Sequence, residues 1–311
     1  MSVPWIVGMM LLGFAGTAVL GLALKWVDRK VTARVQWRKG PPWFQPYADV
    51  AKLLGKETII PENARRTGFL TAPIAGLAAT ILAAAILWSV NVRPVANGGF
   101  MGDLIVVFYL LTVPSLMIVL GGASSGNPHG AIGASREMKL ILSYELPLAL
   151  ALLVAVIAGG WTLSLEEIAT ASGVPVLTKI ALVLGFLVGL LCVQAKLGLV
   201  PFDQAEAETE LMGGVYCEYS GPPLAMFYLT RAMLHAVLPA LLVTVFWGAF
   251  ARGVVSAIVW IVLYLVAVVL ITLVRNTNPR VRIDHAMKFF WYGLTPIAVL
   301  AVVLALIGSA Q

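Results

Sequence analysis

The sequence predicts an all-α, polytopic membrane protein of about eight transmembrane helices, with a cytoplasmic amphipathic helix after the first. Hydrophobic residues make up 60% of the 311 residues and charged residues only 12%, whereas soluble domains hold about 25% charged residues. The mean hydropathy is +0.94. Apolar runs of the roughly 20 residues that a bilayer requires recur along the chain. We therefore expect a single integral membrane domain over residues 1–311.

Eight apolar runs define the expected helices. The first is not a cleavable signal, because Met1–Pro4 carries no positive charge and the run is longer than a signal-peptide core. Only a short turn at Arg252-Gly253 separates the sixth run from the seventh. The runs span residues 5–27, 68–92, 103–121, 139–159, 177–197, 224–250, 254–274 and 287–308.

The basic residues predict the topology. With the connection between the first two helices in the cytoplasm, the cytoplasmic connections hold 16 Lys and Arg residues and the opposite side holds three. By the positive-inside rule, both termini face outward. The net charge of +6 is then a topology signal. Since the basic residues are not interleaved with aromatic ones, we expect no nucleic-acid partner.

Cysteine and histidine predict no metal or redox centre in this chain. Cys192 falls within an apolar run and Cys217 lies in an acidic segment, so the two form no CxxC pair. The three histidines are scattered, and neither a glycine-rich phosphate loop nor a nucleophile motif is present. We expect no catalytic residue and no metal ligand here.

The first connection contains an amphipathic pattern after Pro46, as for a helix that lies in the membrane interface. A surface helix that only anchors the chain is the simpler interpretation. Tyr47, Val50, Leu53 and Leu54 share one side of this helix, and Asp49, Lys52 and Lys56 lie elsewhere.

Glu145 lies inside the fourth run, after a small, glycine-rich connection over residues 121–137. A carboxylate in the hydrocarbon region is costly, so it is paired or protonated and is a candidate functional residue. Pro147 frees a backbone carbonyl nearby, which helps to hydrate the site. The alternative is a charge that lies merely close to the interface.

Five of the fifteen carboxylates lie in one segment, residues 201–221. If residues 203–210 are helical, Asp203, Glu206 and Glu210 share one face and Glu208 lies on another. Crowded like charges raise carboxyl pKa values toward neutrality, so the segment would exchange protons near neutral pH. Glu218 follows in the same segment. A solvated acidic connection is the alternative.

Arg231 lies inside the sixth run with no carboxylate one turn away. Its partner must therefore come from another helix or from the acidic segment. The last connection, residues 275–285, is basic. Its Arg280 and Asp284 either retain the topology or dock a peripheral partner.

Together these segments resemble the heel subunit of the membrane arm of respiratory complex I, the H subunit family, and its counterparts in energy-converting NiFe hydrogenases. The resemblance extends over nearly the whole chain, with eight motifs in the family's order. These are Asp28–Arg34, Gln45–Leu53, Lys56-Glu57, Ser143-Tyr144-Glu145, Pro201-Phe202-Asp203, Glu206–Glu210, Glu218–Gly221, and Pro279-Arg280 with Asp284.

The resemblance implies that the protein joins a peripheral electron-transfer arm to antiporter-like membrane subunits, and that its carboxylates begin a charged axis. Proton or ion coupling is expected at Glu145, Asp203, Glu206, Glu208, Glu210, Glu218 and Arg231. Docking or charge pairing is expected at Arg29, Arg34, Arg38, Asp49, Lys52, Glu57, Glu137, Arg280 and Asp284. Arg29, Arg34 and Arg38 would pair with some of the coupling carboxylates or hold the docked arm.

The same resemblance implies partners and a location. A NiFe centre and iron–sulfur clusters would lie on hydrogenase-like large and small subunits and an iron–sulfur subunit, with none in this chain. The membrane would be the cytoplasmic (inner) membrane of a prokaryotic cell.

Three departures from the complex I pattern place the chain nearer the membrane-bound hydrogenases and the related sulfane-sulfur-reducing complexes. The segment Arg38–Gln45 is abbreviated, which argues against a quinone tunnel, and Arg231 stands where quinone-reducing enzymes have a membrane glutamate. Lys196 and the four residues after it replace an Arg-Ala pair. The block Ala134–Lys139 also resembles the hydrogenase branch.

We therefore expect a subunit that couples ferredoxin oxidation to ion translocation and reduces nothing alone. The alternatives are the quinone-binding H subunit of a complex I, a free-standing transporter and a pure membrane anchor.

Overall fold

The computed structural model describes residues 3–92, 103–171, 175–249 and 253–310, without the side chains of residues 3–6 and 208–209. In these ranges all regular secondary structure is helical, and no strand is present. The fold class predicted from the sequence is confirmed.

Within the described ranges, eight helices are long and apolar enough to span a membrane, as predicted. The first combines α1 (Val3–Leu11), a π-helical turn η1 (Leu12–Gly16) and α2 (Thr17–Val35). The last combines α12 (Ile283–Lys288), the π-helical turn η4 (Phe289–Leu294) and α13 (Thr295–Ser309). The other six are α4 (Arg66–Val92), α5 (Asp103–Ser124), α6 (Pro128–Ala158), α8 (Val176–Lys196), α10 (Gly221–Trp247) and α11 (Val254–Thr277).

The predicted connection 121–137 is wrong for most of its length, because α5 continues to Ser124 and α6 begins at Pro128. Asn127 caps α6: its side-chain oxygen accepts a hydrogen bond from the backbone N–H of His129 at 2.8 Å. Pro128 suits the first helical position, where no N–H is needed. The glycines were interpreted as a loop, whereas Gly133 is buried against the backbone of the acidic segment.

The amphipathic helix predicted after Pro46 is confirmed as α3 (Gln45–Leu54). It lies against α2 and α10, and the Tyr47 hydroxyl donates to the backbone oxygen of Val19 in α2 at 2.9 Å. Trp26 of α2 donates to the backbone oxygen of Pro41 at 3.1 Å. These contacts fix the surface helix beside the first span.

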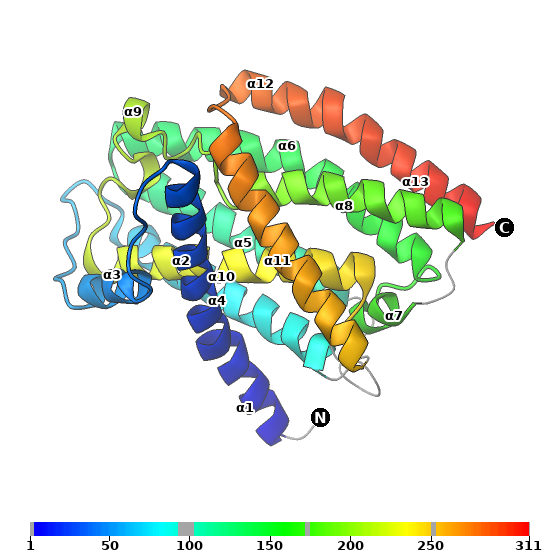
Figure 1. The fold of residues 1–311 in the computed structure, drawn as a ribbon. Helices are drawn as coiled ribbons and strands as arrows, with labels where there is room; N and C mark the ends of the chain where they lie inside the picture. Colours follow the sequence, from blue (N-terminus) through cyan, green and yellow to red (C-terminus); the bar gives the residue numbers. More distant parts are fainter. Residues whose placement is uncertain (1–2, 93–102, 172–174, 250–252, 311) are drawn as a thin grey trace.

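Helix α10 is the central helix of the bundle, and 89% of the residues in its most apolar stretch are buried. It packs against α2, α4 and α8, while α6, α8 and α13 pack together on one side (Figure 1). Small residues permit the closest approach. Gly21 of α2 lies directly on the backbone of Ala232, where an added Cβ would be 2.2 Å from the carbonyl oxygen.

The long connections on the predicted cytoplasmic side meet at one end of the bundle. In Figure 1, α3 and α9 (Glu208–Leu211) lie at that end and both termini lie away from it. Arg65 N–H donates to Ser124 O at 2.9 Å, and Val281 N–H donates to Pro201 O at 3.1 Å. The connection before α12 therefore holds the start of the acidic segment, and the connection before α4 is held to the end of α5.

Candidate functional site

The acidic segment does not form a continuous helix over residues 203–210, the condition under which its carboxylates would share one face. Only α9 is helical, and a short 3₁₀ turn η2 (Gly214–Tyr216) follows it. Gly214 has a φ of +53°, and a Cβ there would lie 1.9 Å from the backbone oxygen of Ala205. The segment thus folds back on itself, so Asp203, Glu206 and Glu210 do not share one helical face.

An arginine from a different part of the chain pairs with each of these three carboxylates. Arg280, in the connection before α12, lies 2.7 Å from Asp203. Arg231 of α10 forms an ion pair with Glu206. Arg136 of α6 lies 2.7 Å from Glu210. Ion pairs to α6, to α10 and to the connection before α12 therefore hold the acidic segment in its folded-back conformation.

Mutual repulsion is not the main influence on the pKa of Asp203 or of Glu210, contrary to the expectation from crowding. Burial is the main cause that raises the pKa of Asp203; Arg280 opposes this, and Glu206 adds a smaller upward contribution. The hydrogen bond and charge of Arg136 lower the pKa of Glu210. Glu210 is therefore ionised at neutral pH. The side chain of Glu208 lies outside the described residues.

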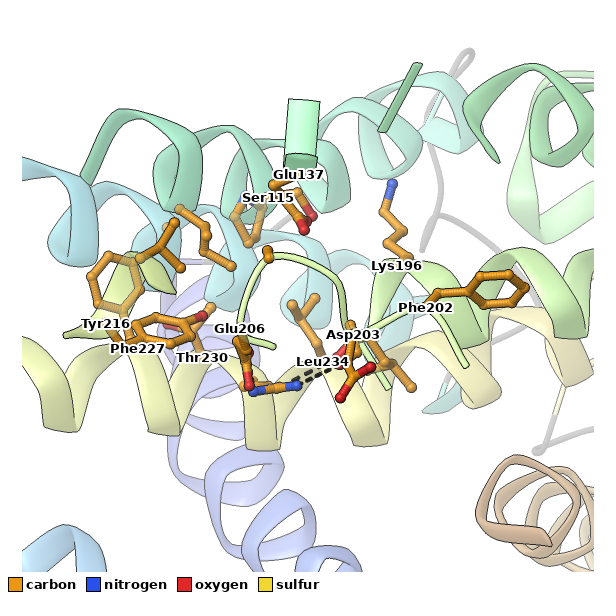
Figure 2. Close-up of a pocket in the computed structure, with 18 residues that line it drawn as sticks. Ser115, Glu137, Lys196, Phe202, Asp203, Glu206, Tyr216, Phe227, Thr230 and Leu234 are labelled. Carbon is orange, nitrogen blue, oxygen red and sulfur yellow. Dashed lines mark hydrogen bonds and ion pairs between the residues drawn. The ribbon is translucent and has the colours of Figure 1, made fainter. Parts of the chain in front are cut away.

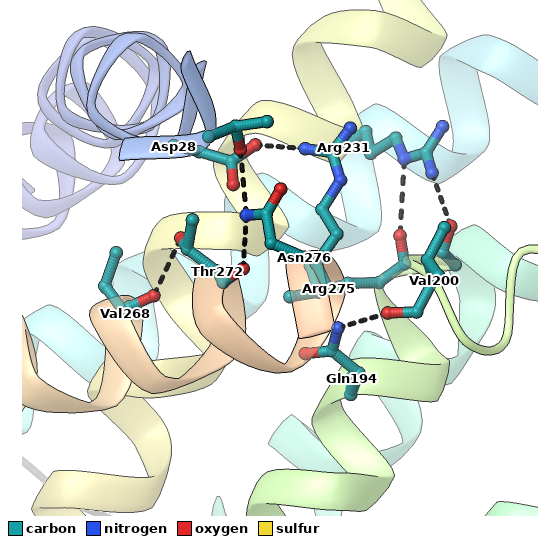
Figure 3. Close-up of polar contacts among 11 residues, drawn as sticks. Asp28, Gln194, Val200, Arg231, Val268, Thr272, Arg275 and Asn276 are labelled. Carbon is teal, nitrogen blue, oxygen red and sulfur yellow. Dashed lines mark hydrogen bonds and ion pairs between the residues drawn. The ribbon is translucent and has the colours of Figure 1, made fainter. Parts of the chain in front are cut away.

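Arg231 finds its partner in the acidic segment, as predicted. Besides Glu206, its guanidinium donates to the backbone oxygen of Gly198 at 2.7 Å and to that of Leu197 at 3.3 Å (Figure 3). Both acceptors lie at the carboxyl end of α8, where backbone oxygens lack helical partners. Arg231 thus joins α10, α8 and the acidic segment.

A small cavity of about 30 Å³ lies beneath the acidic segment. In Figure 2, Glu137 and Ser115 reach it from above, and Asp203 and Glu206 lie on the opposite side. Glu137 is buried and forms no ion pair among the residues that the structure describes. Lys196 also lines the cavity. Ionisable groups of α6, α8 and α10 therefore meet at one internal space.

A larger groove of about 660 Å³ lies between α2, α3, α10 and the start of the acidic segment. Eleven of its twenty lining residues are charged. Asp28 of α2 is 1% exposed in its side chain and forms an ion pair with Arg275 at the end of α11 (Figure 3). Both the groove and the small cavity are lined by Asp203, Glu206 and Arg231, which therefore stand between them.

Lys25, Asp28 and Arg275 line the groove but were not among the candidate site residues predicted from the sequence. Only their positions in the sequence could have indicated a role in the site. Lys25 lies inside the first apolar run, and the other two residues lie just after the first and seventh runs. Charges at such places usually interact with lipid headgroups or water. Only the packing of α2 against α11 shows that Asp28 and Arg275 pair.

Two other predicted carboxylates occupy distinct places. Glu145 lies within α6, as predicted, and its Oε1 is buried without a hydrogen-bond partner. Glu218 accepts a hydrogen bond from the side-chain amide of Asn127 at 2.5 Å. Glu218 therefore holds the acidic segment to the start of α6, whereas the buried Oε1 of Glu145 meets no hydrogen-bond partner in the described part of the chain.

Arg280 pairs with the coupling carboxylate Asp203 as a charge-pairing residue should, but Arg29, Arg34 and Arg38 form no ion pair with the coupling carboxylates whose side chains the structure describes. Arg29 pairs instead with Asp49 of α3 at 2.9 Å, which lowers the pKa of Asp49 against the effect of burial. Arg34 and Arg38 line a separate basic depression and form no ion pair within the described part of the chain. Arg136, Arg231 and Arg280 take the role expected of these arginines.

The remaining docking candidates are at the surface. Lys52 lines the groove, Glu57 is exposed, and Asp284 lies 4.0 Å from the exposed Arg282. In the described ranges, no three His, Cys, Asp or Glu side chains gather in a way that could hold a metal ion.

Comparison with known proteins identifies the family. A model of the family described as NADH dehydrogenase matches residues 7–306. The chain belongs to this family.

Curated members of the NADH dehydrogenase family are similar to the chain over most of their length. The H subunit of NADH-quinone oxidoreductase from Dehalococcoides mccartyi (strain CBDB1) is 34% identical over 299 residues, covering 93% of this chain and 82% of that protein. An H subunit of NADH-quinone oxidoreductase from Syntrophobacter fumaroxidans is 32% identical over 319 residues, covering 94% of each.

A solved structure is also similar. A chain from the membrane-bound sulfane sulfur reductase, an archaeal respiratory membrane complex, superposes with a TM-score of 0.83 at 29% identity, covering 96% of this chain and 99% of that one. The family and the eight apolar helices together show a multi-pass membrane protein. The resemblance to the H subunit family is confirmed.

Proposed function

We propose that the chain is the membrane subunit that links the peripheral electron-transfer arm to the ion-pumping arm of a ferredoxin-oxidising complex. It reduces nothing alone and couples the redox reaction to proton or ion translocation. The arrangement of the acidic segment supports this role most directly. Its carboxylates are bound to α6, α10 and the α11–α12 connection, and it covers a cavity lined by Glu137.

This arrangement gives a route from a docked partner to the membrane interior. A partner that moves the acidic segment would displace Glu206 from Arg231, leaving two partly buried charges uncompensated. The electrostatic potential at Glu137, across the same cavity, would change with it. Motion or charge at the surface would thus alter the proton affinity of a buried carboxylate.

The similarity to a chain of the sulfane sulfur reductase complex, over almost the full length of both chains, supports a sulfur-reducing or hydrogen-evolving complex. In such an assembly, a NiFe centre or iron–sulfur clusters would lie on hydrogenase-like large and small subunits and an iron–sulfur subunit. Antiporter-like subunits would continue the membrane arm, and the complex would lie in a prokaryotic cytoplasmic membrane.

The metal content of the complex that co-purifies with this chain in mild detergent tests the proposal. We expect the purified complex to contain iron, whichever electron acceptor it reduces. Nickel in stoichiometric amount would assign a hydrogenase, and iron without nickel would leave sulfur or quinone reduction. A preparation without either metal would contradict a role in any redox complex.

Replacing Glu145 or Glu210 by Gln tests the coupling role, because Gln keeps the size of the side chain and cannot exchange a proton. We expect proton-coupled activity to fall by about tenfold or more for Glu145→Gln, with the complex still assembled. Glu166→Gln on the short helix α7 (Leu165–Thr170) is a matched control away from the cavity. Loss of the complex from the membrane would instead show a structural role.

A quinone-reducing complex I subunit is the second candidate, because relatives are named as H subunits of NADH-quinone oxidoreductase and the groove between α2, α3 and α10 is large. Its mainly charged lining is poorly suited to an apolar quinone tail. Inhibition of the purified complex by quinone-site inhibitors would favour this candidate. Full activity in their presence would favour ferredoxin-linked reduction of sulfur or protons.

A further inference from the structure

A basic depression of about 390 Å³ lies where the first membrane-spanning helix ends, at the start of the connection to α3. Four of the six described residues that line it are cations, and none is a carboxylate. It shares no lining residue with the cavity beneath the acidic segment or with the charged groove, so it is a separate feature of the surface. The lining residues are Lys30, Arg34, Trp37, Arg38, Lys39 and Gly40.

The four cations of this basic depression have no counter-ion in the part of the chain that the structure describes, where none of them forms an ion pair. Arg29, on the same helix, is by contrast paired with Asp49 of α3. Four like charges in one depression repel one another unless an anion lies among them. The charge of the depression is therefore completed by an anion from outside the chain.

Backbone contacts fix the shape of the basic depression. The N–H of Trp37 donates to the backbone oxygen of Arg34 at 3.2 Å. The N–H of Arg38 donates to that of Ala33 at 2.7 Å. These two bonds close the carboxyl end of α2, so its carbonyl oxygens do not compete for the cations. Gly40 then packs back on α2, where an added Cβ would lie 2.8 Å from a side chain of that helix. Cations of the helix and of the connection thus meet in one place.

Trp37 has a backbone conformation that favours glycine. Its φ is +57°, at the position after a helix end where glycine is usual because a side chain is strained there. The residue is nevertheless 97% exposed, and Trp43 and Phe44 in the same connection are also exposed. Tryptophan beside lysine and arginine at the end of a membrane-spanning helix is typical of the lipid headgroup region. The contacts that compensate this strain therefore lie outside the chain, at the membrane surface.

The first span lies at the edge of the described bundle. Only 33% of the residues in its most apolar stretch are buried, against 89% for α10. In Figure 1, α2 crosses in front of the bundle, and the connection to α3 runs along the same end of the molecule as α3. A helix that is exposed in this way leaves the bilayer among lipid headgroups. The basic depression on its last turn can therefore be reached by lipid.

We propose that the basic depression binds the headgroup of an anionic phospholipid. The guanidinium groups of Arg34 and Arg38 suit the oxygens of a phosphate diester, and Lys30 and Lys39 add charge that attracts anionic lipid. The exposed indole of Trp37 lies at the level of the lipid's glycerol, as indole rings do at the membrane interface. The volume of the depression is in the range of small-molecule sites.

This inference goes beyond the proposed function and does not depend on which acceptor the complex reduces. A bound headgroup joins α2 to the connection that follows it, which is also held by the hydrogen bond from Trp26 to the backbone oxygen of Pro41. Because the lipid binds the folded chain, it stabilises the complex. The lipid thereby fixes the first span beside α3.

Titration of the intact complex in mild detergent with dioleoylphosphatidylglycerol, followed by native mass spectrometry, tests the site. The double variant Arg34→Gln, Arg38→Gln removes two charges and should weaken binding of this lipid by about tenfold or more. The double variant Arg65→Gln, Arg66→Gln removes two exposed cations outside the depression and should bind normally. The unmodified complex should bind dioleoylphosphatidylcholine, which has no net charge, more weakly.

Three results would overturn the inference. The first is equal binding of dioleoylphosphatidylglycerol by the Arg34→Gln, Arg38→Gln variant and the unmodified complex. If that variant also lost peripheral subunits, the depression would bind an acidic protein surface instead. The second is binding of dioleoylphosphatidylcholine as tight as that of the anionic lipid. The third is displacement of dioleoylphosphatidylglycerol by inorganic phosphate, which would show a site for free phosphate.

Trp37→Gly separates lipid binding from folding. Glycine suits a φ of +57°, so the thermal unfolding temperature of the lipid-free complex should not fall. Binding of dioleoylphosphatidylglycerol should nevertheless weaken, and this lipid should raise the unfolding temperature less than it does in the unmodified complex. Lipid binding as tight as in the unmodified complex would overturn the placement of Trp37 at the headgroup, and with it the inference.

Discussion

At the scale of single residues, arginines from distant segments compensate several carboxylates inside this chain. Three carboxylates with little exposed surface each bind an arginine from a distant segment: Asp28, Asp203 and Glu206. Glu137 and Glu145 lack such partners in the described structure. Asp203 and Glu206 hold the acidic segment in place, whereas Asp28 joins α2 to the end of α11.

Removing the charge of Arg231 should destabilise the protein more than removing an exposed arginine. Arg231→Met leaves Glu206 without its counter-ion at a site that is 26% exposed, which costs about 3–5 kcal/mol. The thermal unfolding temperature of the purified complex should fall accordingly. The double variant Arg231→Met, Glu206→Gln should recover part of the loss. Arg282→Gln, at a residue that is 83% exposed, should have no effect, and an equal loss there would contradict this prediction.

The pKa of Asp203 predicts a pH dependence. Burial raises this pKa above 3.8, so the folded state binds more protons than the unfolded state between the two pKa values, and stability falls as pH rises through that window. Arg280→Gln removes the charge that opposes the shift. The stability lost in Arg280→Gln should therefore be large at neutral pH and shrink as pH falls through the folded pKa. A loss that is independent of pH in unfolding experiments would contradict this account.

At the scale of helices, α10 positions the site because it contacts the helices that carry most of the other ionisable groups. Arg231 and the Ala232 backbone lie where α2, α8 and the acidic segment meet α10. The break of the acidic segment into turns, rather than one helix, lets each carboxylate face a different arginine.

Close packing of α2 on α10 predicts that Gly21→Ala is harmful. The new Cβ would lie 2.2 Å from the carbonyl oxygen of Ala232, and overpacking of this kind costs about 1–3 kcal/mol. Gly8→Ala in the same span meets no atom within 4 Å and serves as the control. Thermal unfolding and yield of the assembled complex measure both. If the two variants were equally stable, α2 would be able to shift away from α10 without loss of stability, which would contradict this prediction.

At the scale of the whole molecule, the connections with most of the charged residues lie at one end and the termini lie away from them (Figure 1). This polarity agrees with the distribution of Lys and Arg along the sequence. The orientation in the membrane itself stays a prediction from the positive-inside rule.

Labelling with a membrane-impermeant maleimide tests that orientation. Cys217 is exposed on the acidic segment and Cys192 is buried, so Cys217 should react only from the cytoplasmic side. Ser309→Cys in a Cys217→Ser background should react only from outside, because the C-terminal end of α13 lies on the opposite side. Reaction of Ser309→Cys from the cytoplasmic side would reverse the topology.

The sequence by itself determined the eight spans, the amphipathic helix after Pro46, Glu145 in the fourth span and the need of Arg231 for a distant partner. These follow from apolar run length, helical periodicity and the cost of an unpaired charge, all of which are local. Tertiary structure alone decided which charges meet. Glu206 with Arg231 and Asp28 with Arg275 join residues 25 and 247 positions apart, and Lys196 approaches α6 only because α8 packs there. No local pattern encodes such distances, because ion pairing depends on how the helices pack.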